Sequence, residues 1–278
     1  MIYLVPHSGL ANRIRVIVSG LSFSDKVNHQ LTIIWNKDKS LYCSFNDLFE
    51  KNDKIIVKKK SFVLKSIIKA QNSPLIKKAI CRLFSIEFTL FDSNVKDFVW
   101  STGSNLIDYK KLPFEVKNYF FSTCHEFHFE SAYLKLLTPV KSILFEINKN
   151  LSKFTSKTVG VHIRRTDHLQ AILESPLDAF VKMMLLELTA DSEISFYLAS
   201  DDPEVETLLV NKFPGKIITY KKKYSRTTVK GIQDAMVDLY SLSHTCKIYG
   251  SYFSSFSDLA SRIGDIPLIV IRKDQGQQ

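Results

Sequence analysis

The chain has 278 residues, of which 45% are hydrophobic and 24% are charged, and its formal net charge is +10. This composition excludes a disordered chain, and the length suffices for one large core or two ordinary ones. No stretch approaches the roughly eighteen apolar residues of a membrane-spanning helix, and the first residues read as a strand rather than a signal peptide, so we expect a cytoplasmic protein. The four cysteines are far apart, with no C-x-x-C pair, which predicts neither a structural zinc site nor a disulfide framework.

The first fifty residues have the pattern of a βαβ unit. An apolar strand over residues 2–5 leads through a turn to a helix over residues 11–28 and then to a second strand. The turn contains Gly9, and Asn12 and Arg13 enter the helix that follows. These polar residues either face a ligand or form ordinary helix surface.

A strongly basic segment follows at residues 58–86, which contain seven Lys and one Arg but no acidic residue. Apolar residues are interleaved with these cations, as in helices that lie on an anionic membrane surface, and Pro74 divides the segment into two short helices. Lysine-rich helices that pack their apolar faces on the protein explain the pattern equally well. Peripheral contact with the inner membrane is therefore one of two interpretations. Nucleic acid is not an expected partner, because no nucleic-acid motif accompanies the segment.

A polar stretch before residue 158 is typical of a domain junction, and a new strand follows it. We therefore expect two α/β domains, over residues 1–153 and 154–278. No internal repeat or low-complexity tract interrupts either of them.

The most informative segment, residues 159–167, is a strand that ends in a charged cluster. Apolar residues alternate along the strand, and His162, Arg164, Arg165 and Asp167 lie at its carboxyl end. Open α/β sheets bind their ligands at this end of their strands. Two guanidinium groups suit a phosphate there, because each presents a planar fork of donors. A surface salt bridge is the plain alternative for either arginine.

A second strand, over residues 194–200, ends in a polar turn that contains Asp201, Asp202 and Pro203. Asp202 is placed to cap a helix that begins at Pro203. The two acidic residues superficially resemble a metal-binding pair, but capping accounts for them, and no metal site is predicted.

A third strand, over residues 247–251, opens into a serine-rich turn before a helix from about Asp258. Ser254 and Ser255 lie in this turn. Their hydroxyl groups and the backbone N–H groups at the start of a helix form an anion site. Ordinary helix capping is the alternative.

Between the second and third strands, residues 231–245 have the pattern of an amphipathic helix that carries Asp238. A carboxylate at this position can accept two parallel hydrogen bonds, from the ring N–H and the exocyclic amine of guanine. Solvated helix surface is the alternative. The basic residues 221–226, in the preceding loop, either cover a nucleotide or are solvated.

In chain order, the segments HIRRTD, FYLASDDP, GIQDAMVDLYSLS and YGSYFSSFSDLA resemble the three sugar-nucleotide motifs of the α1,6- and peptide-O-fucosyltransferase superfamily, which includes the rhizobial nodulation fucosyltransferases. The resemblance covers about residues 158–272 and, more weakly, the N-terminal glycine turn, whereas residues 51–150 match nothing. It implies an α/β fold with two Rossmann-like domains facing a cleft, the GT-B type of glycosyltransferase. The N-terminal domain would lie on the acceptor side, and the C-terminal domain would bind the sugar nucleotide.

The resemblance also implies roles for individual residues. Arg164 would be the main β-phosphate ligand, supported by Arg165, while His162 and Asp238 would hold the guanine. The implied donor-binding residues are Gly9, Asn12, Arg13, His162, Arg164, Asp238, Ser254 and Ser255, and the implied catalytic residues are Arg164, Arg165, Asp167 and Glu174. Several relatives carry a catalytic carboxylate shortly after RRTD. Here the nearest later acid, Glu174, is displaced from that position.

The implied activity is inverting, metal-independent transfer of fucose from GDP-fucose to a bacterial surface glycan or a lipid-linked saccharide, with no cofactor. A transferase for another nucleotide sugar would keep the same fold, because no residue is assigned to the sugar ring. The displaced Glu174 also fits a non-catalytic protein that binds a nucleotide or a glycan. Release of GDP in the presence of an acceptor separates the enzyme from such a binder.

Overall fold

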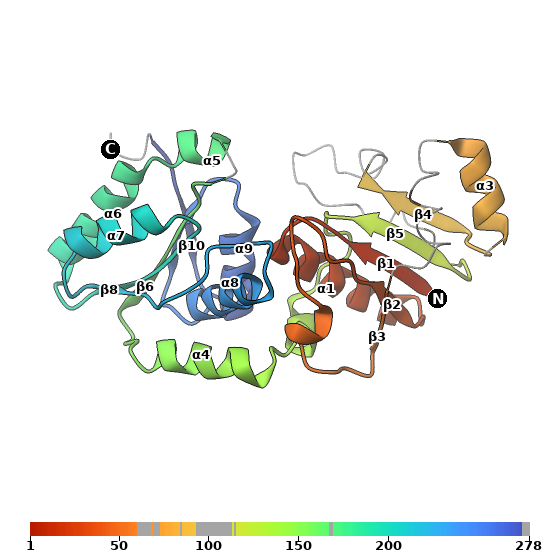
Figure 1. Cartoon of the computed structure of the whole chain (residues 1–278), viewed down its shortest axis with the longest axis horizontal. Helices are drawn as coiled ribbons and strands as arrows, with labels where there is room; N and C mark the ends of the chain where they lie inside the picture. Colours follow the sequence, from red (N-terminus) through yellow and green to blue (C-terminus); the bar gives the residue numbers. More distant parts are fainter. Residues whose placement is uncertain are drawn as a thin grey trace. The chain divides into compact units, whose positions relative to one another are not determined.

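The computed structural model describes residues 1–59, 68, 73–83, 85–92, 113, 115–166 and 169–273. The chain divides into two compact units, unit 1 (Met1–Val140) and unit 2 (Lys141–Gln278). Each unit is built on a sheet of five strands (Figure 1). All the strand pairs are parallel. The predicted α/β class is therefore confirmed.

Unit 1 has the strand order β3-β2-β1-β5-β4. The three inner strands of its sheet are almost wholly buried, so they are apolar runs rather than alternating patterns. Its strands are β1 (Ile2–Pro6), β2 (Leu31–Ile34), β3 (Ile55–Lys58), β4 (Phe88–Phe91) and β5 (Tyr119–Thr123). Its helices are α1 (Leu10–Lys26), α3 (Pro74–Leu83) and the short 3-10 helices η1 (Phe45–Asp47) and η5 (Ser131–Leu136).

Helix α1 supplies much of the core of unit 1. Ile14, Ile17 and Leu21 recur at three- and four-residue spacing and are fully buried, as expected for the inner face of an amphipathic helix. Phe23 packs edge-on against the ring of Tyr119 in β5. These contacts fix α1 on the sheet, so the turn that precedes it is anchored at the carboxyl end of β1.

Unit 2 has the strand order β10-β9-β6-β7-β8. Its strands are β6 (Thr158–Ile163), β7 (Ser195–Ser200), β8 (Ile217–Ile218), β9 (Ile248–Ser251) and β10 (Leu268–Ile271). Its helices are α4 (Lys141–Leu151), α5 (Leu169–Glu174), α6 (Leu177–Ala190), α7 (Pro203–Lys212), α8 (Val229–Leu242) and α9 (Ser255–Gly264).

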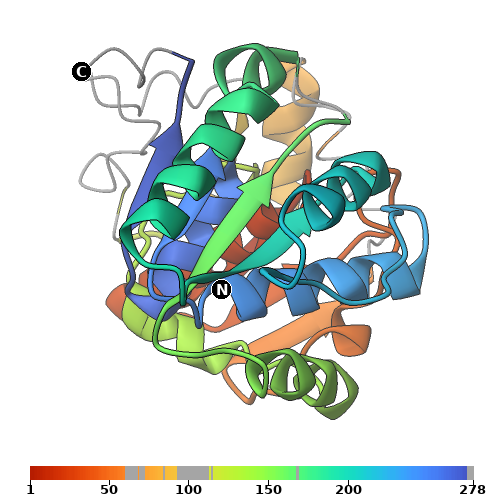
Figure 2. The same ribbon diagram turned by 90° about the vertical axis from the view of Figure 1, so that its left-hand side faces the viewer.

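The division into units differs from the predicted junction after residue 153, because α4 belongs to unit 2. Helix α4 lies beside α8 in both views (Figures 1 and 2). The side chain of Asn150, in α4, donates to the hydroxyl of Ser241, in α8, at 3.1 Å. Both residues are buried, so this contact ties α4 to unit 2.

The core of unit 2 lies between the sheet and its helices. Val161 and Ile163 of β6 are fully buried and belong to one cluster with Phe180 and Met184 of α6. The apolar alternation of the sequence thus marks one face of a strand that is buried on both faces, as in other parallel sheets. None of the helices within the described ranges is long and apolar enough to cross a membrane.

The chain reverses its direction of travel across each sheet at one place. In unit 2, β6 is followed by β7 on one side, whereas β9 pairs with β6 on the other. In unit 1, β1 lies between β2 and β5 in the same way. Open α/β sheets bind ligands outside the carboxyl ends of the strands at such a switch point. The fold therefore nominates the ends of β6 and β9, and the ends of β1 and β5.

The first of the two predicted lysine-rich helices falls mostly on residues outside the described ranges. Within that segment, the structure describes α3, which begins at Pro74, where the sequence predicts the break.

Candidate functional site

The ends of β6 and β9 are joined by hydrogen bonds that involve Ser251. The backbone N–H of Arg164, which follows β6, donates to the Ser251 hydroxyl at 3.0 Å. That hydroxyl in turn donates to the carbonyl of His162 at 3.3 Å. The polar turn after β6 is therefore held against the last residue of β9, at the switch point of unit 2.

Helix α9 begins directly beside this junction. Ser254 is its N-cap and accepts from the backbone N–H of Phe256 at 3.3 Å, so the helix begins at Ser255 and not at about Asp258 as predicted. The Ser254 hydroxyl also lies 3.4 Å from Nδ1 of His162, whose ring stacks on Phe256. The structure thus brings together four of the predicted donor-binding residues: His162, Arg164, Ser254 and Ser255.

His162 is held neutral in this site. Burial lowers its pKa to about 4, and the cations of Arg164 and Lys222 add to the effect, against the opposing charge of Asp201. An arginine side chain keeps its charge at every pH of interest. The fixed positive charge after β6 is therefore carried by Arg164 and Arg165 and not by His162, and Arg164 is the one bonded to Ser251, close to the N-terminus of the ten-residue α9.

Arg165 has a different environment from Arg164. Its guanidinium donates to the backbone carbonyl of Ser175 at 2.9 Å and to that of Ile172 at 3.4 Å, at the end of α5. The predicted role as a supporting phosphate ligand is not what these contacts indicate. They indicate that Arg165 holds α5 against the turn after β6.

The acidic pair after β7 is used in capping. Asp202 accepts from the backbone N–H of Glu204 at 2.9 Å and caps α7, which begins at Pro203 as predicted. Asp201 accepts from the backbone N–H of Arg165 at 2.7 Å and from the hydroxyl of Thr166 at 2.7 Å. The pair therefore shapes two turns at the carboxyl edge of the sheet.

Asp238 lies in a buried polar network that the sequence does not reveal. Its Oδ1 accepts from the Tyr197 hydroxyl at 2.7 Å, and its Oδ2 lies 3.0 Å from Nζ of Lys222. Lys222 is also 3.2 Å from Glu206. Burial raises the pKa of Asp238 against the opposing effect of Lys222. Asp238 is therefore not solvated helix surface, and both of its oxygens already have a partner.

Only one of the two remaining predicted catalytic acids lies within the described residues. The carboxylate of Glu174, at the end of α5, is 3.3 Å from Nζ of Lys273. Asp167 lies outside the described residues. Neither is placed by the structure as a base.

In unit 1, the turn after β1 places the predicted Gly9, Asn12 and Arg13. Gly9 is the N-cap of α1 and provides no side-chain cap, and a Cβ atom there would meet open space. The Asn12 amide donates to the Ser8 hydroxyl at 3.1 Å. The side chain of Arg13 is fully buried and pairs with Asp38 at 2.6 Å. These contacts indicate a structural role, and its contact with a donor stays a prediction.

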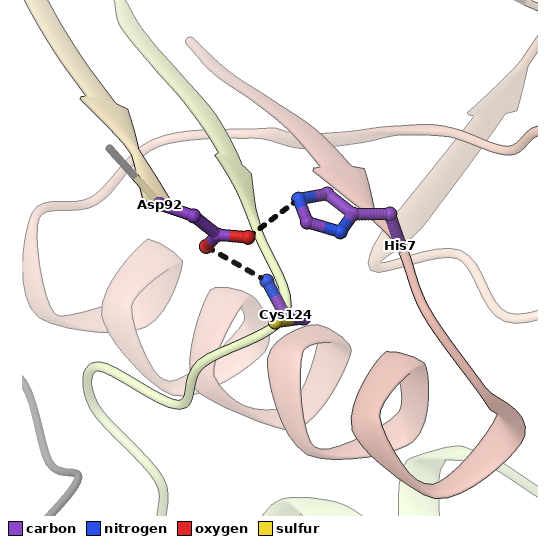
Figure 3. Close-up of side chains that lie close together, drawn as sticks. All are labelled: His7, Asp92 and Cys124. Atoms are coloured by element: carbon purple, nitrogen blue, oxygen red, sulfur yellow. Dashed lines mark hydrogen bonds and ion pairs between the residues drawn. The ribbon is translucent and has the colours of Figure 1, made fainter. Parts of the chain in front are cut away.

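A cluster of three polar side chains that the sequence does not reveal lies at the carboxyl ends of β1, β4 and β5. His7 Nε2 is 3.0 Å from Asp92 Oδ2, and one side-chain nitrogen, oxygen or sulfur atom each of His7, Asp92 and Cys124 lie within 4.8 Å of one another (Figure 3). Burial and the charge of Asp92 raise the pKa of the Cys124 thiol to about 12, so the thiol keeps its proton. This arrangement is that of a hydrogen-bonded His–Asp pair with a neighbouring thiol.

Two α/β units, each built on a parallel sheet with polar turns at its carboxyl edge, define the class of fold of this chain. No protein-family model and no curated protein matches the sequence. Solved structures do match the fold. NodZ alpha-1,6-fucosyltransferase soaked with GDP-fucose is 17% identical, with a TM-score of 0.64 over 97% of this chain and 94% of that chain.

Two further fucosyltransferases share the fold. A variant of FUT1 from Arabidopsis thaliana in complex with GDP is 14% identical, with a TM-score of 0.63 over 98% of this chain and 70% of that one. POFUT1 in complex with GDP-fucose is 12% identical, with a TM-score of 0.54 over 97% of each chain. At these identities the likeness establishes the fold. This chain thus has the fold of the fucosyltransferases that its sequence motifs resemble.

Proposed function

We propose that this protein is a glycosyltransferase that uses a nucleoside diphosphate sugar. The observation that carries the proposal is the position of Arg164, at the switch point of unit 2, beside a neutral His162 and the N-terminus of α9. Backbone N–H groups at a helix N-terminus and a planar guanidinium are both suited to diphosphate oxygens. The two units would be Rossmann-like domains facing a cleft, with the donor bound to unit 2 and the acceptor to unit 1.

The donor that we propose is GDP-fucose. Its support is the set of motifs around Arg164 and Asp238, together with neighbours of the same fold that were crystallised with GDP-fucose or GDP. The proposed reaction inverts the sugar centre and uses no metal ion. As the bond to the sugar breaks, negative charge grows on the β-phosphate. Preorganised donors such as Arg164 and the N–H groups of α9 stabilise that charge more in the transition state than before it.

The contacts of Asp238 limit how it could bind guanine. Each carboxylate oxygen has two lone-pair sites, so Tyr197 and Lys222 leave one site on each oxygen. Paired donors of guanine would use these remaining sites, or would take the place of Lys222 on Oδ2. Adenine and uracil lack the paired donors, which gives the site its proposed preference.

The acceptor that we propose is a bacterial surface glycan or a lipid-linked saccharide, with peripheral contact of the protein to the cytoplasmic face of the membrane. Its support is the basic character of residues 58–86. Replacing Lys58 and Lys59 with Gln, together with the other lysines of that segment, should weaken binding to anionic vesicles and leave soluble turnover intact.

A nucleotide screen followed by a turnover assay tests the proposed function. We expect GDP to raise the melting temperature more than UDP, ADP or CMP does. We then expect GDP to be released from GDP-fucose, slowly with water as the acceptor and faster with an added saccharide. Stabilisation by GDP without any release would favour a binding protein, for which the pairing of Glu174 with Lys273 is the supporting contact. Equal stabilisation by every nucleotide would contradict the guanine assignment.

A further inference from the structure

Three neighbouring strands of unit 1 end in residues that meet at one point. β1 and β5 are neighbours, and β4 pairs with β5 on its other side. His7 follows β1, Asp92 follows β4, and Cys124 follows β5. Figure 3 shows the carboxylate of Asp92 between the ring of His7 and the backbone of Cys124. This point is the switch point of the sheet of unit 1, where ligands of such sheets bind.

Asp92 selects the tautomer of the neutral histidine ring of His7. Its Oδ2 is 3.0 Å from Nε2 of His7, and its Oδ1 accepts from the backbone N–H of Cys124 at 3.1 Å. Burial alone would raise the pKa of Asp92, but hydrogen bonds from His7 and Thr123 lower it to about 2. An ionised carboxylate only accepts, so Nε2 of His7 carries a proton, and in the neutral ring the lone pair is on Nδ1.

Hydrogen bonds from Arg13 hold the turn that bears His7. Ser8 has a φ of 70°, in the left-handed region that a non-glycine residue adopts only where its surroundings hold it. The fully buried Arg13 supplies that hold, because its Nε donates to the Ser8 carbonyl at 2.9 Å. Another of its nitrogens donates to the carbonyl of Asn36 at 2.5 Å. Arg13 thus positions the residue next to His7.

One ring nitrogen of His7 is available, in contrast to His29 in the same unit. His29 uses both ring nitrogens, with the carbonyls of Val27 and Val116 at 2.7 and 2.9 Å, as a structural histidine does. Within the described ranges, His7 uses only Nε2 in a side-chain contact. Its side chain is 37% exposed and that of Asp92 is 31% exposed, so a molecule at the strand ends can reach the ring.

We propose that His7, oriented by Asp92, is the general base that accepts the proton of the acceptor hydroxyl. This inference rests on the proposed glycosyl transfer. The lone pair of Nδ1 takes the hydroxyl proton as the acceptor oxygen bonds to the anomeric carbon. The bond from that carbon to the β-phosphate oxygen breaks, and its electron pair leaves with GDP. Asp92 stabilises the imidazolium, which then releases the proton to solvent.

The test measures GDP release from GDP-fucose with water as the acceptor. His7→Ala should lower the rate by about 100-fold or more, the usual contribution of a general base, with the affinity for GDP and the melting temperature unchanged. Imidazole added to the solution should restore part of the lost rate. Asp92→Asn should lower the rate by less, without rescue by imidazole, and Asp92→Glu should recover part of it. His244→Ala is the matched control. This histidine is exposed just after α8, so its substitution should leave the rate of GDP release unchanged, with or without imidazole.

The outcomes distinguish failure of the proposed function from failure of His7 as its general base. A wild-type protein that binds GDP but never releases it from GDP-fucose overturns both the proposed function and the base. A wild-type protein that turns over, with His7→Ala equally active, overturns the base alone. Loss of activity in His7→Ala that imidazole does not relieve, or that comes with a lower melting temperature, also overturns the base and assigns the pair to structure.

Discussion

Lys222 and Asp238 form an ion pair of 3.0 Å in the interior of unit 2, with 3% and 8% of their side chains exposed. Glu206 lies 3.2 Å from the same ammonium group. Burial lowers the pKa of Lys222, but these two carboxylates outweigh it and raise the pKa above its ordinary value. Lys222 therefore remains charged and ties the loop before α8 to the residue proposed to read guanine.

The buried pair predicts a large loss of stability when its cation is removed. Lys222→Met should lower the free energy of unfolding by about 3–5 kcal/mol, because it leaves Asp238 and Glu206 as buried carboxylates without a cation. Urea unfolding at pH 7 measures this loss. Lys223→Met is the matched control. Lys223 is the next residue and is exposed, so its substitution should change the free energy of unfolding by less than about 0.5 kcal/mol. Equal effects of the two variants would contradict the buried pair.

The proposed donor site predicts that Asp238 sets the nucleotide preference. Asp238→Asn removes the acceptor for one of the two guanine donors, so the melting-temperature shift with GDP should fall towards that with UDP. The shift with UDP itself should stay nearly constant, because in the proposed site the phosphate groups of both nucleotides would meet the same Arg164 and α9. A variant that loses both shifts equally would show that Asp238 supports the site rather than reads the base.

The two arginines after β6 should behave differently when changed to lysine. Arg164→Lys keeps the charge but loses the planar fork, and should cost roughly 2.7–4 kcal/mol of transition-state stabilisation, on the order of 100- to 1000-fold in rate. Arg165→Lys should cost stability rather than turnover, because its guanidinium holds the carbonyls of Ile172 and Ser175. Rates of GDP release and melting temperatures of both variants separate the two effects. Near wild-type turnover of Arg164→Lys would contradict the proposed mechanism.

Activity should survive treatment with EDTA. In the proposed site, Arg164 and the N-terminus of α9 would meet the diphosphate charge, while Asp201 and Asp202 accept hydrogen bonds from backbone N–H groups. GDP release before and after chelation is the measurement. A loss that Mg²⁺ or Mn²⁺ reverses would return Asp201 and Asp202 to consideration as metal ligands.

The part of the site that follows local patterns is predictable from the sequence. The alternating residues of β6 and the proline at the start of α7 place Arg164 and Asp202 at strand ends, because strand and capping patterns depend on neighbouring residues. The parallel order of the strands then brings Arg164 next to Ser251, and His162 next to Ser254.

Burial and long-range pairing are what the sequence conceals. Arg13 reads as polar helix surface, yet it is sealed in the core by Asp38, a residue 25 positions away in a loop. Lys222 reads as a solvated loop residue for the same reason, since Asp238 and Glu206 lie on two other elements. Asp92 stands in a region with no recognisable motif, and only the order of the strands brings it to His7.

The neutral state of His162 predicts a dependence of stability on pH. Burial lowers its pKa from 6.5 to about 4, so between these values the unfolded chain binds a proton that the folded chain does not. The free energy of unfolding should therefore fall as the pH drops from about 6.5 to about 4, by about 3 kcal/mol for this group, and should gain nothing from it above pH 6.5. His162→Gln removes the titrating group, so its stability should fall less over the same range. Urea unfolding of both proteins at pH 7 and pH 4.5 measures the difference. Equal losses of unfolding free energy in the two proteins would contradict this prediction. They would show that His162 takes up its proton in the folded protein as readily as in the unfolded chain.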